Sequence, residues 1–390
     1  MNIGCAPSSA GSPDSAASCR LQFLMQSGRR ILFLAADAYG GNGGIATFNR
    51  EFLQALASVP EVTEITVLPR LAFHANDVPP AKVKVDTAGL GGAANYVSAV
   101  LRRSLPRPRY DLVHCGHINL APLAIAAARL HRAPATLSVH GIDAWDRHPR
   151  ITVRVALSHF KRIVSVSRKT KERFENWSGL SGLQIIPNTV HLESFGIRPR
   201  REDLVERWEL GGKKVLMTLG RLVGQERAKG FDEVLDVLPR LAVQYPNLVY
   251  MICGDGPDKQ RLAAKAKELG IASRVRFTGF IAEHEKSDLY QLADVFVMPS
   301  RGEGFGIVLL EALACGVPAI GSTTDGTRDA LLDGELGRLV DPDQPDELIA
   351  AIGASFLEPR QVPKALQHYA FTRFEERVHE FADAVMSDLK

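Results

Sequence analysis

Two glutamates separated by seven residues stand in a stretch of the chain that holds few other acids. Glu303 lies among the glycines of segment 300–306, and Glu311 lies in the apolar run that follows. Burying an unpaired carboxylate is costly, so we expect a polar ligand in a crevice to compensate Glu311. Two acceptors at this spacing suit a ligand with hydroxyl groups at both ends and phosphates between them. A sugar nucleotide has this form.

The residues around the two acids could bind the phosphates. Three glycines precede a predicted helix that starts near Ile307, and the first N–H groups and the dipole of a helix favour an anion. Two cations, Arg221 and Lys229, follow a strand predicted for residues 214–219. At the carboxyl end of a strand, an Arg and a Lys can hold a diphosphate together. The alternative is ordinary surface charge.

Two features of the N-terminal half also stand at the ends of predicted strands. Gly43 and Gly44 belong to a glycine-rich turn whose N–H groups can approach a phosphate or a sugar. The same glycines could instead simply permit tight packing of strand on helix. His140 directly follows the apolar strand 135–139, and ligands bind at this edge of open α/β sheets. We therefore predict that His140 contacts the ligand, the alternative being a structural histidine.

Short apolar runs that alternate with helical segments must position all of these residues. Such runs are typical of strands buried on both faces of a parallel sheet, and the alternation predicts an α/β fold. The pattern stops in a polar, irregular stretch, residues 191–207, and then starts again. This predicts two doubly wound, Rossmann-like domains that face each other across a cleft. We expect residues 29–190 to form the first and 191–367 the second.

The composition is that of a globular protein, with 45% hydrophobic and 23% charged residues and no apolar run long enough to span a membrane. Five scattered cysteines without a CxxC pair argue against a disulfide framework or a zinc site and favour a reducing compartment. Residues 1–28 are rich in Ser, Ala, Gly and Pro and lack the features of a secretion signal. We expect them to be disordered, with Met25 as a second candidate translation start.

The net charge of +3 conceals an asymmetry. Residues 1–190 carry 22 Lys and Arg against 12 Asp and Glu, while the remainder carries 25 against 32. A basic half indicates an anionic partner: nucleic acid, a membrane surface or a phosphate-bearing substrate. Segment 96–109 is either a solvated helix end or a patch that rests on anionic lipid headgroups. It mixes apolar residues with four arginines: Arg102, Arg103, Arg107 and Arg109.

These residues together resemble a known family. The stretch EGFGIVLLE, from Glu303 to Glu311, matches the E-x7-E motif of the retaining glycosyltransferases of family 4, which have the GT-B fold. The resemblance covers nearly the whole chain from about Ile31. It implies that a C-terminal helix, about residues 368–390, packs back on the first domain. The further matches, in chain order, include His140–Asp143, Gly220–Leu222, Lys229–Gly230 and Gly254–Pro257.

The resemblance also implies a role for each site residue. Glu303 would hold ring hydroxyls of the donor sugar and Glu311 the ribose diol. Arg221 and Lys229 would neutralise the diphosphate as it leaves, and His140 would contact the donor sugar near the reacting centre. The remaining donor contacts would come from Gly43 and Gly44, from the backbone N–H groups of Phe305, Gly306 and Ile307, and from Phe280 and Ile281 beside the nucleobase.

The family pattern needs no metal ion or other cofactor, because an Arg and a Lys supply the electrostatic stabilisation that a cation gives elsewhere. Retention is described for this family as a front-face reaction in which the leaving phosphate helps to deprotonate the acceptor hydroxyl. Glu303 would then be a positioning and electrostatic residue, not a nucleophile. Two segments depart from the family pattern: Pro-Asn-Gly-Val-Asp is Pro187–His191 here, and Gly-Gly-x-Pro-Glu is Thr324–Arg328.

We therefore expect a metal-independent, retaining hexosyltransferase that uses a UDP- or GDP-linked sugar in the synthesis of an exopolysaccharide, a lipopolysaccharide or another surface glycan. Its acceptor would be a glycan or a lipid-linked molecule. Its location would be the cytoplasm, with peripheral contact to an anionic membrane, and no nucleic-acid partner is expected. Two alternatives stay open: a sugar-nucleotide epimerase of the same fold, and a non-catalytic sugar-nucleotide binder.

Overall fold

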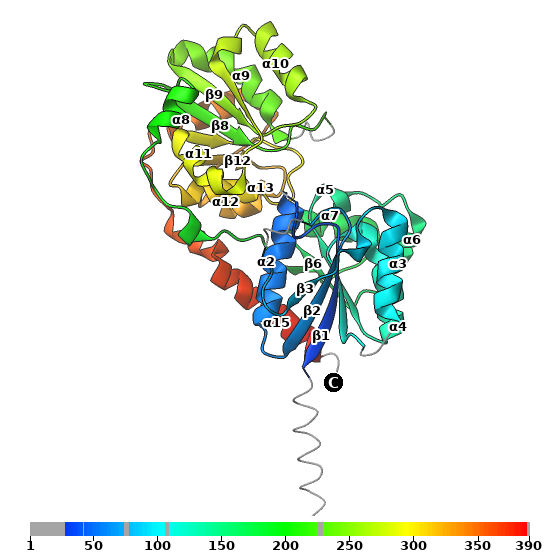
Figure 1. Cartoon of the computed structure of the whole chain (residues 1–390). Helices are drawn as coiled ribbons and strands as arrows, with labels where there is room; N and C mark the ends of the chain where they lie inside the picture. The colour runs from blue at the N-terminus through cyan, green and yellow to red at the C-terminus, as the bar shows by residue number, and fades with distance from the viewer. Residues whose placement is uncertain (1–27, 42, 74–77, 106–108, 225–228, 388–390) are drawn as a thin grey trace, which may run out of the picture.

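A computed structural model describes residues 28–41, 43–73, 78–105, 109–224 and 229–387. It contains two parallel sheets, each covered by helices, which appear in the lower and upper halves of Figure 1. The predicted fold class is confirmed, since each sheet belongs to a Rossmann-like α/β domain. The predicted disorder of residues 1–28 concerns a segment that, apart from Gly28, lies outside the described residues.

The first sheet has seven strands in the order β3-β2-β1-β4-β5-β6-β7. Strand β1 lies inside this sheet and is apolar and buried from Ile31 to Ala35, which suits burial on both faces. The strands are β1 (Arg29–Ala35), β2 (Val62–Pro69), β3 (Val83–Val85), β4 (Leu112–Cys115), β5 (Ala135–Val139), β6 (Arg162–Ser165) and β7 (Gln184–Ile185). The helices are α2 (Gly44–Ser58), α3 (Ala93–Ser104), α4 (Ala121–His131), α5 (Ile142–Trp145), α6 (Ile151–Leu157) and α7 (Arg168–Ser178).

The second sheet has six strands in the order β10-β9-β8-β11-β12-β13. The stretch 191–207, predicted to be irregular, ends in a short helix, α8 (Glu202–Arg207). The strands are β8 (Lys214–Leu219), β9 (Leu248–Cys253), β10 (Val275–Gly279), β11 (Val295–Val297), β12 (Ala319–Ser322) and β13 (Arg338–Val340). The other helices are α9 (Phe231–Gln244), α10 (Lys259–Glu268), α11 (Lys286–Leu292), α12 (Ile307–Ala314), α13 (Thr327–Ala330) and α14 (Pro345–Ser355).

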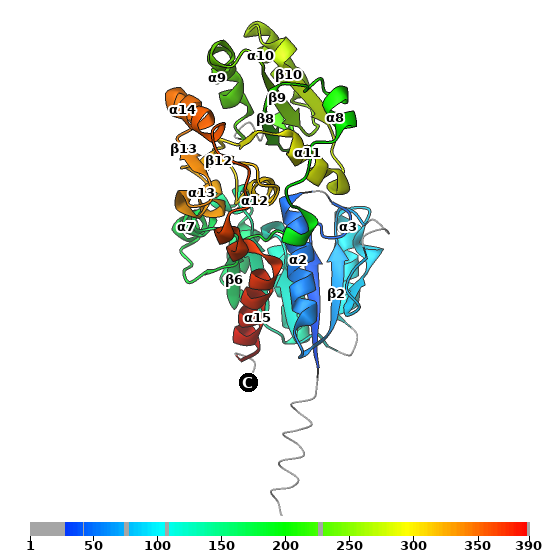
Figure 2. The same cartoon turned by 90° about the vertical axis from the view of Figure 1, so that its left-hand side faces the viewer.

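Helices cover both faces of the first sheet. The apolar side chains of α2 and of the last helix, α15 (Phe371–Ser387), belong to one core, and those of α3, α4, α6 and α7 belong to another on the opposite face. Figure 2 shows α15 beside α2. No helix in the described part of the chain is long and apolar enough to cross a membrane.

The chain crosses between the domains twice, and the two crossings lie side by side. The N–H of Val190 donates to the carbonyl of Tyr369 at 2.9 Å, and Val190 also forms an isolated β-bridge with Ala370. Helix α15 then runs along α2, where the rings of Phe381 and Phe52 meet edge to face with centres 5.8 Å apart. The predicted return of the C-terminal helix to the first domain is confirmed.

The contact of α15 with α2 should contribute measurably to stability. Phe381 is only 1% exposed, so the substitution Phe381→Ala removes a fully buried ring and should lower the free energy of unfolding by about 3–5 kcal/mol. Urea denaturation measures this change. The substitution Asp383→Ala on the exposed side of the same helix serves as control. If both variants unfold at the same urea concentration as the parent, Phe381 is not packed against α2.

Candidate active site

The carboxyl edges of the two sheets meet at a pair of glycines. A Cβ atom placed on Gly304 would lie 2.0 Å from the carbonyl oxygen of His140, and one placed on Gly141 would lie 2.8 Å from the Cα of Gly304. Real Cβ atoms cannot approach so closely, so only glycine permits this approach of the loop after β5 to the loop after β11. Figure 1 shows α12 and α13 above α2, with α5 to their right at this junction.

An ion pair holds the domains together beside this contact. Arg168, at the start of α7, binds the carboxylate of Asp329 on α13 through both its side chain and its backbone N–H, the latter at 2.7 Å. The guanidinium also reaches Asp333 at 2.9 Å. The hydroxyl of Tyr369, at the second crossing, donates to the carbonyl of Asp329. The two edges are therefore held face to face by residues outside the predicted ligand site.

The loop that carries Glu303 is organised by Asp325. This carboxylate is 2% exposed and accepts hydrogen bonds from the Ser300 hydroxyl at 2.6 Å, the Glu303 N–H at 2.8 Å, and the hydroxyl and N–H of Thr327 at 2.7 Å and 3.0 Å. Burial raises the pKa of Asp325 to about 6, although these bonds act in the opposite direction. Asp325 lies in the segment Thr324–Arg328 that departs from the family pattern, and here it has a structural role.

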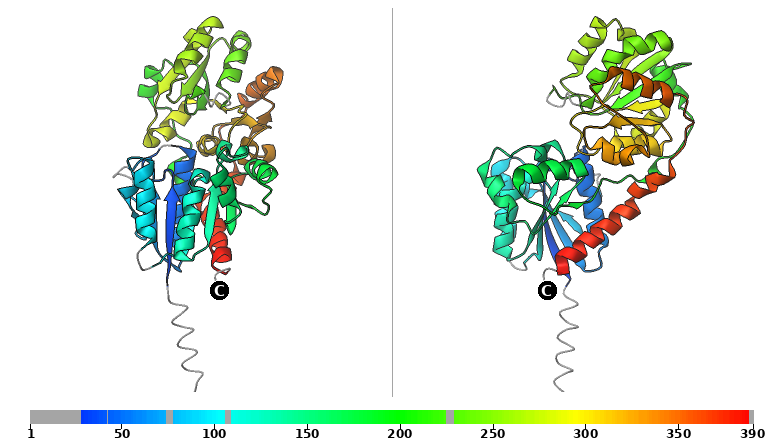
Figure 3. Two further views of the ribbon diagram at one scale, coloured as in Figure 1. Left: turned by 90° about the vertical axis from the view of Figure 1, so that its right-hand side faces the viewer. Right: turned by 180° about the vertical axis from the view of Figure 1, so that it is seen from behind.

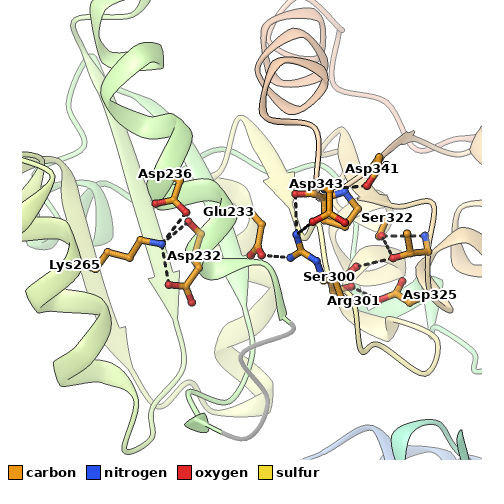
Figure 4. Close-up of polar contacts among 12 residues, drawn as sticks. Asp232, Glu233, Asp236, Lys265, Ser300, Arg301, Ser322, Asp325, Asp341 and Asp343 are labelled. Atoms are coloured by element: carbon orange, nitrogen blue, oxygen red, sulfur yellow. Dashed lines mark hydrogen bonds and ion pairs between the residues drawn. The ribbon is translucent and has the colours of Figure 1, made fainter.

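Arg301 fixes the same loop from its other side. Figure 4 shows its guanidinium between Glu233 on α9 and Asp343 beyond β13. It binds both carboxylates, the second at 2.6 Å, and also donates to the carbonyl of Pro342 at 3.0 Å. With Asp325 and Arg301 acting together, the backbone position of Glu303 is set before any ligand binds.

The structure brings Glu303 and Lys229 into contact. The Lys229 ammonium donates to Oε2 of Glu303 at 2.6 Å, and their side chains are 21% and 18% exposed. The two residues follow β8 and β11, which are neighbouring strands. Arg221 stands on the same edge, exposed, just beyond Gly220 and β8. The sequence prediction that these three side chains share one edge agrees with these positions, while their roles toward a ligand remain a prediction.

Glu311 is buried, but the expectation that it depends on a ligand for compensation is wrong. It is 5% exposed, and its two oxygens accept from the Lys286 ammonium at 3.0 Å and from the Tyr290 hydroxyl at 2.6 Å. Burial favours a lower pKa for Lys286, but Glu311 and the more exposed Glu283, 2.9 Å away, outweigh it and raise the pKa above its usual value. The charge of Glu311 therefore has a partner within the chain.

The N-termini of α2 and α12 lie close to each other. Helix α2 begins at Gly44 after Gly43, and neither a capping side chain nor an acid satisfies its first turn. Helix α12 begins at Ile307 after Gly306, whose φ of 101° is one that a side chain would disfavour, and it also lacks a capping side chain. A Cβ placed on Gly44 would lie 4.0 Å from the end of the Ile307 side chain. The N–H groups of both helices can thus approach one anion.

His140 is buried and neutral. It is 8% exposed, its Nε2–H donates to the carbonyl of Gly116 at 2.9 Å, and the ring of Phe48 lies edge-on at 5.1 Å. Burial lowers its pKa to about 3. Because a carbonyl can only accept, Nε2 carries the proton and Nδ1 keeps a lone pair. His140 can accept a hydrogen bond at neutral pH, but it cannot act as a general acid there.

The other predicted donor contacts differ in exposure. Phe280, just beyond β10, is 62% exposed, and Ile281 is partly buried. Phe305 is 1% exposed with its ring against Tyr369, so only its backbone can reach a ligand. No three His, Cys, Asp or Glu side chains in the described ranges gather as a metal site would require. The expectation of a metal-free site stays a prediction.

Sequence reasoning missed three residues of this site. Lys286 and Tyr290 are four residues apart on α11, and nothing in their spacing connects them with Glu311. Asp325 was noted only as part of a departure from the family pattern. The sequence also predicted no role for Asp143, the last residue of the His140–Asp143 match. Its Oδ2 is shielded from solvent without a hydrogen-bond partner among the described residues, and burial raises its pKa to about 7.

Two family models match the chain, one in each half. The model "Glycosyltransferase Family 4" matches residues 42–194, and "Glycosyl transferases group 1" matches residues 200–373. A GDP-mannose-dependent alpha-(1-6)-phosphatidylinositol monomannoside mannosyltransferase of Mycolicibacterium smegmatis is 34% identical over 66% of this chain and 71% of its own. A phosphatidyl-myo-inositol mannosyltransferase of the same species is 31% identical over 71% and 69%.

Several solved structures share the fold of this chain. Anabaena HepE in complex with UDP-glucose superposes with a TM-score of 0.73 at 20% identity, covering 91% of this chain and 99% of its own. A sucrose-phosphate synthase from Thermosynechococcus elongatus gives 0.74 at 18% identity, with 92% and 100% covered. At these identities the likeness extends to the fold alone.

The neutral state of His140 predicts a dependence of stability on pH. Its pKa is about 6.5 when unfolded and about 3 when folded, so between these values only the unfolded chain binds the proton. Stability should therefore fall as the pH drops below about 6.5, by up to about 1.4 kcal/mol per pH unit from this residue. Urea unfolding at pH 7 and pH 5 should show a smaller loss for His140→Asn than for the parent chain.

The exposed His159 gives the matched control. The variant His159→Asn should lose stability over this pH range as the parent does. Comparing variants removes the opposite contributions of Asp143 and Asp325, whose raised pKa values make the fold less stable as the pH rises. A His140→Asn variant with the parent's pH dependence would show that His140 is not held neutral.

Proposed function

Because the chain belongs to the glycosyltransferases of family 4, which have the GT-B fold, we propose that it transfers a hexose from a nucleoside-diphosphate sugar to a lipid-linked acceptor with retention of anomeric configuration and without a metal ion. The observation that carries this proposal is the position of Lys229, Glu303 and Glu311 around one glycine turn. The facing N-terminus of α2 completes a site for an extended anionic donor.

The proposed reaction uses these groups as follows. The acceptor hydroxyl oxygen forms a bond to the anomeric carbon as the bond from that carbon to the diphosphate oxygen breaks. The electron pair of the broken bond goes to the diphosphate, which also takes up the acceptor proton on the same face of the sugar. Lys229, Arg221 and the N–H groups at Ile307 stabilise the charge that develops on the leaving group. Glu303 orients the sugar ring.

Two buried groups support a division of roles within the site. Neutral His140 offers its Nδ1 lone pair to a sugar hydroxyl but supplies no proton, so the proton balance rests with the diphosphate and the acceptor. Glu311, held by Lys286 and Tyr290, keeps lone pairs for the ribose diol, because each carboxylate oxygen accepts more than one hydrogen bond. The exposed ring of Phe280 offers a stacking surface for the base.

The relatives point to particular substrates. The two relatives from Mycolicibacterium smegmatis are mannosyltransferases, and one of them depends on GDP-mannose. Their names give a phosphatidylinositol monomannoside and phosphatidyl-myo-inositol as the molecules they act on. We therefore propose GDP-mannose as the donor to test first and a glycolipid with an inositol or sugar hydroxyl as the acceptor. We further propose that the protein works on the cytoplasmic side of the membrane, with peripheral contact to its anionic lipids.

Transfer itself provides the decisive experiment. Incubation with GDP-mannose, and in parallel with UDP-glucose, should yield a glycosylated acceptor whose new linkage has the donor's α configuration by NMR, with EDTA present. Donor turnover to an isomeric sugar nucleotide without transfer would favour the epimerase alternative. Binding without turnover of any donor, over a range of glycolipid acceptors, would favour the non-catalytic binder. A β linkage would contradict retention.

The site assignment makes a separate prediction for donor binding. Lys229→Met removes a charge-assisted contact to the diphosphate, and Glu311→Gln weakens the grip on the ribose, so each should lower the affinity for GDP at least about tenfold. Isothermal titration calorimetry measures this. Glu311→Gln should also reduce the preference for GDP over 2′-deoxy-GDP, whereas Lys229→Met should leave that preference intact.

Glu283→Gln is the matched control for the ribose contact. Glu283 binds the same Lys286 as Glu311 but is 58% exposed, so its substitution should change GDP affinity by less than about threefold. Unchanged GDP binding in both Lys229→Met and Glu311→Gln would remove the basis for this donor site.

A further inference from the structure

We propose that the outer face of the first domain, formed by α3, α6 and the end of α7, docks on a bilayer of anionic phospholipid, with a pocket between α6 and α7 that receives a lipid headgroup phosphate. This inference rests on the proposed location at a membrane and names the surface responsible. The sequence predicted a lipid contact only at the arginine-rich end of α3. The proposed surface also includes α6, for which the sequence predicted no role.

Helix α3 exposes an apolar ridge. Val97, Leu101 and Leu105 follow one another at intervals of four residues, and they are 38%, 42% and 73% exposed, although the opposite side of the helix is buried. They border a shallow apolar groove that Arg102 closes on one side. Arg103, by contrast, is engaged with Asp86 at 2.6 Å, and Arg107 lies outside the described residues.

Helix α6 repeats this arrangement. Ile151 and Val155 are 64% and 59% exposed and lie one turn apart on the same side of the helix. Helices α3, α4 and α6 pack next to one another on the face of the sheet opposite α2 and α15. Figure 3 shows this face from two further directions, with α15 on the other side of the domain. The two apolar ridges therefore belong to one face.

A basic pocket lies beside the second ridge. Arg147 and Arg154 line it together with Ser158 and with the apolar side chains of Leu157, Trp177 and Leu180, and its volume is about 390 Å³. The indole N–H of Trp177 is directed inward, to the carbonyl of Ala144 at 2.7 Å, so the ring contributes only apolar surface. A cationic rim over an apolar floor suits a phosphate joined to a hydrocarbon chain.

No acid in the described part of the chain neutralises the two arginines of the pocket. Arg154 donates only to the carbonyls of His148 and Pro149, at 2.7 Å and 3.0 Å, and Arg147 has no ion pair with a described residue. The nearest acid in the sequence, Asp146, is paired with Arg173 at 3.0 Å. The guanidiniums are thus available to an external anion.

The charge of the whole segment favours a lipid surface. Residues 93–161 carry ten Lys and Arg against three Asp and no Glu, which accounts for most of the basic character of the N-terminal half. Exposed aliphatic side chains interleaved with arginines are typical of surfaces that insert shallowly into an anionic interface. Nucleic acid would instead require exposed aromatic or polar base contacts, and here the exposed apolar residues are aliphatic.

Co-sedimentation of the full-length protein with vesicles tests the proposal. Binding to vesicles of phosphatidylglycerol and phosphatidylcholine should exceed binding to pure phosphatidylcholine and should weaken as salt rises. Arg147→Gln should lower the partition coefficient about fivefold, and the double variant Arg147→Gln/Arg154→Gln about 25-fold. Leu101→Gln/Leu105→Gln should lower it at least about tenfold. Glycerol phosphate in solution should not compete at concentrations comparable to the lipid.

Matched substitutions in the second domain are the controls. Lys213→Gln/Lys267→Gln removes the same charge from exposed sites, and Val243→Gln/Leu357→Gln removes exposed apolar side chains. An equal loss in these controls, parental binding by the Arg147→Gln variant, equal binding to neutral vesicles, or strong competition by glycerol phosphate would each overturn the proposal. Arg147→Gln is the primary variant because its side chain holds no described element in place.

Activity separates this inference from the proposed transferase function. With a short-chain acceptor in detergent, the arginine and leucine variants should transfer sugar at the parental rate. If they do so while vesicle binding is lost, both ideas stand. If transfer fails in the parent while vesicle binding follows the expected pattern, only the transferase function is wrong.

Discussion

The geometry of the site depends on the contact between two glycine backbones, Gly141 at the end of β5 and Gly304 in the loop after β11. Any side chain at Gly304 would collide with the carbonyl of His140, so the two sheet edges can meet only because neither residue has one. This contact brings the backbone after β5, at His140 and Gly141, against the loop that carries Glu303. The glycines permit the two sheet edges to come this close. The Arg168–Asp329 pair and the two adjacent chain crossings between the domains then hold the edges at that distance.

The two glutamates of the site are paired within the chain. Glu303 is paired with Lys229, and Glu311 with Lys286 and Tyr290. A buried carboxylate without such partners would destabilise the fold by several kcal/mol, and the pairs remove that penalty. They also hold each side chain in place, so a ligand meets groups that are already oriented. Asp325 holds the backbone of the loop that carries Glu303, and Arg301 ties the same loop to Glu233 and Asp343. Neither residue needs to touch a ligand to do so.

Much of the fold followed from the sequence, because apolar strand runs and glycine stops are local signals. The two cations and two acids could also be assigned to one edge, since residues that follow parallel strands gather there. Lys286 and Tyr290 could not be found in this way. They lie 25 and 21 residues before Glu311 on another helix, and only the packing of α11 against α12 brings them together. The neutral state of His140 likewise depends on burial by Phe48, which a single sequence does not reveal.

In the proposed reaction, Lys229 binds Glu303 before the donor arrives and the diphosphate afterwards. The ammonium and the carboxylate are 2.6 Å apart, and both side chains are about one fifth exposed, so water partly screens their attraction. A diphosphate brings at least two negative charges to the same ammonium, and it is additionally stabilised by the helix N-termini. Lys229 can then divide its three donors between carboxylate and phosphate. In that reaction, charge that grows on the leaving group would shift the balance toward the phosphate, and Glu303 would be released to accept from the sugar. On this proposal, the Lys229–Glu303 contact would weaken as the stabilisation of the leaving group by Lys229 strengthens.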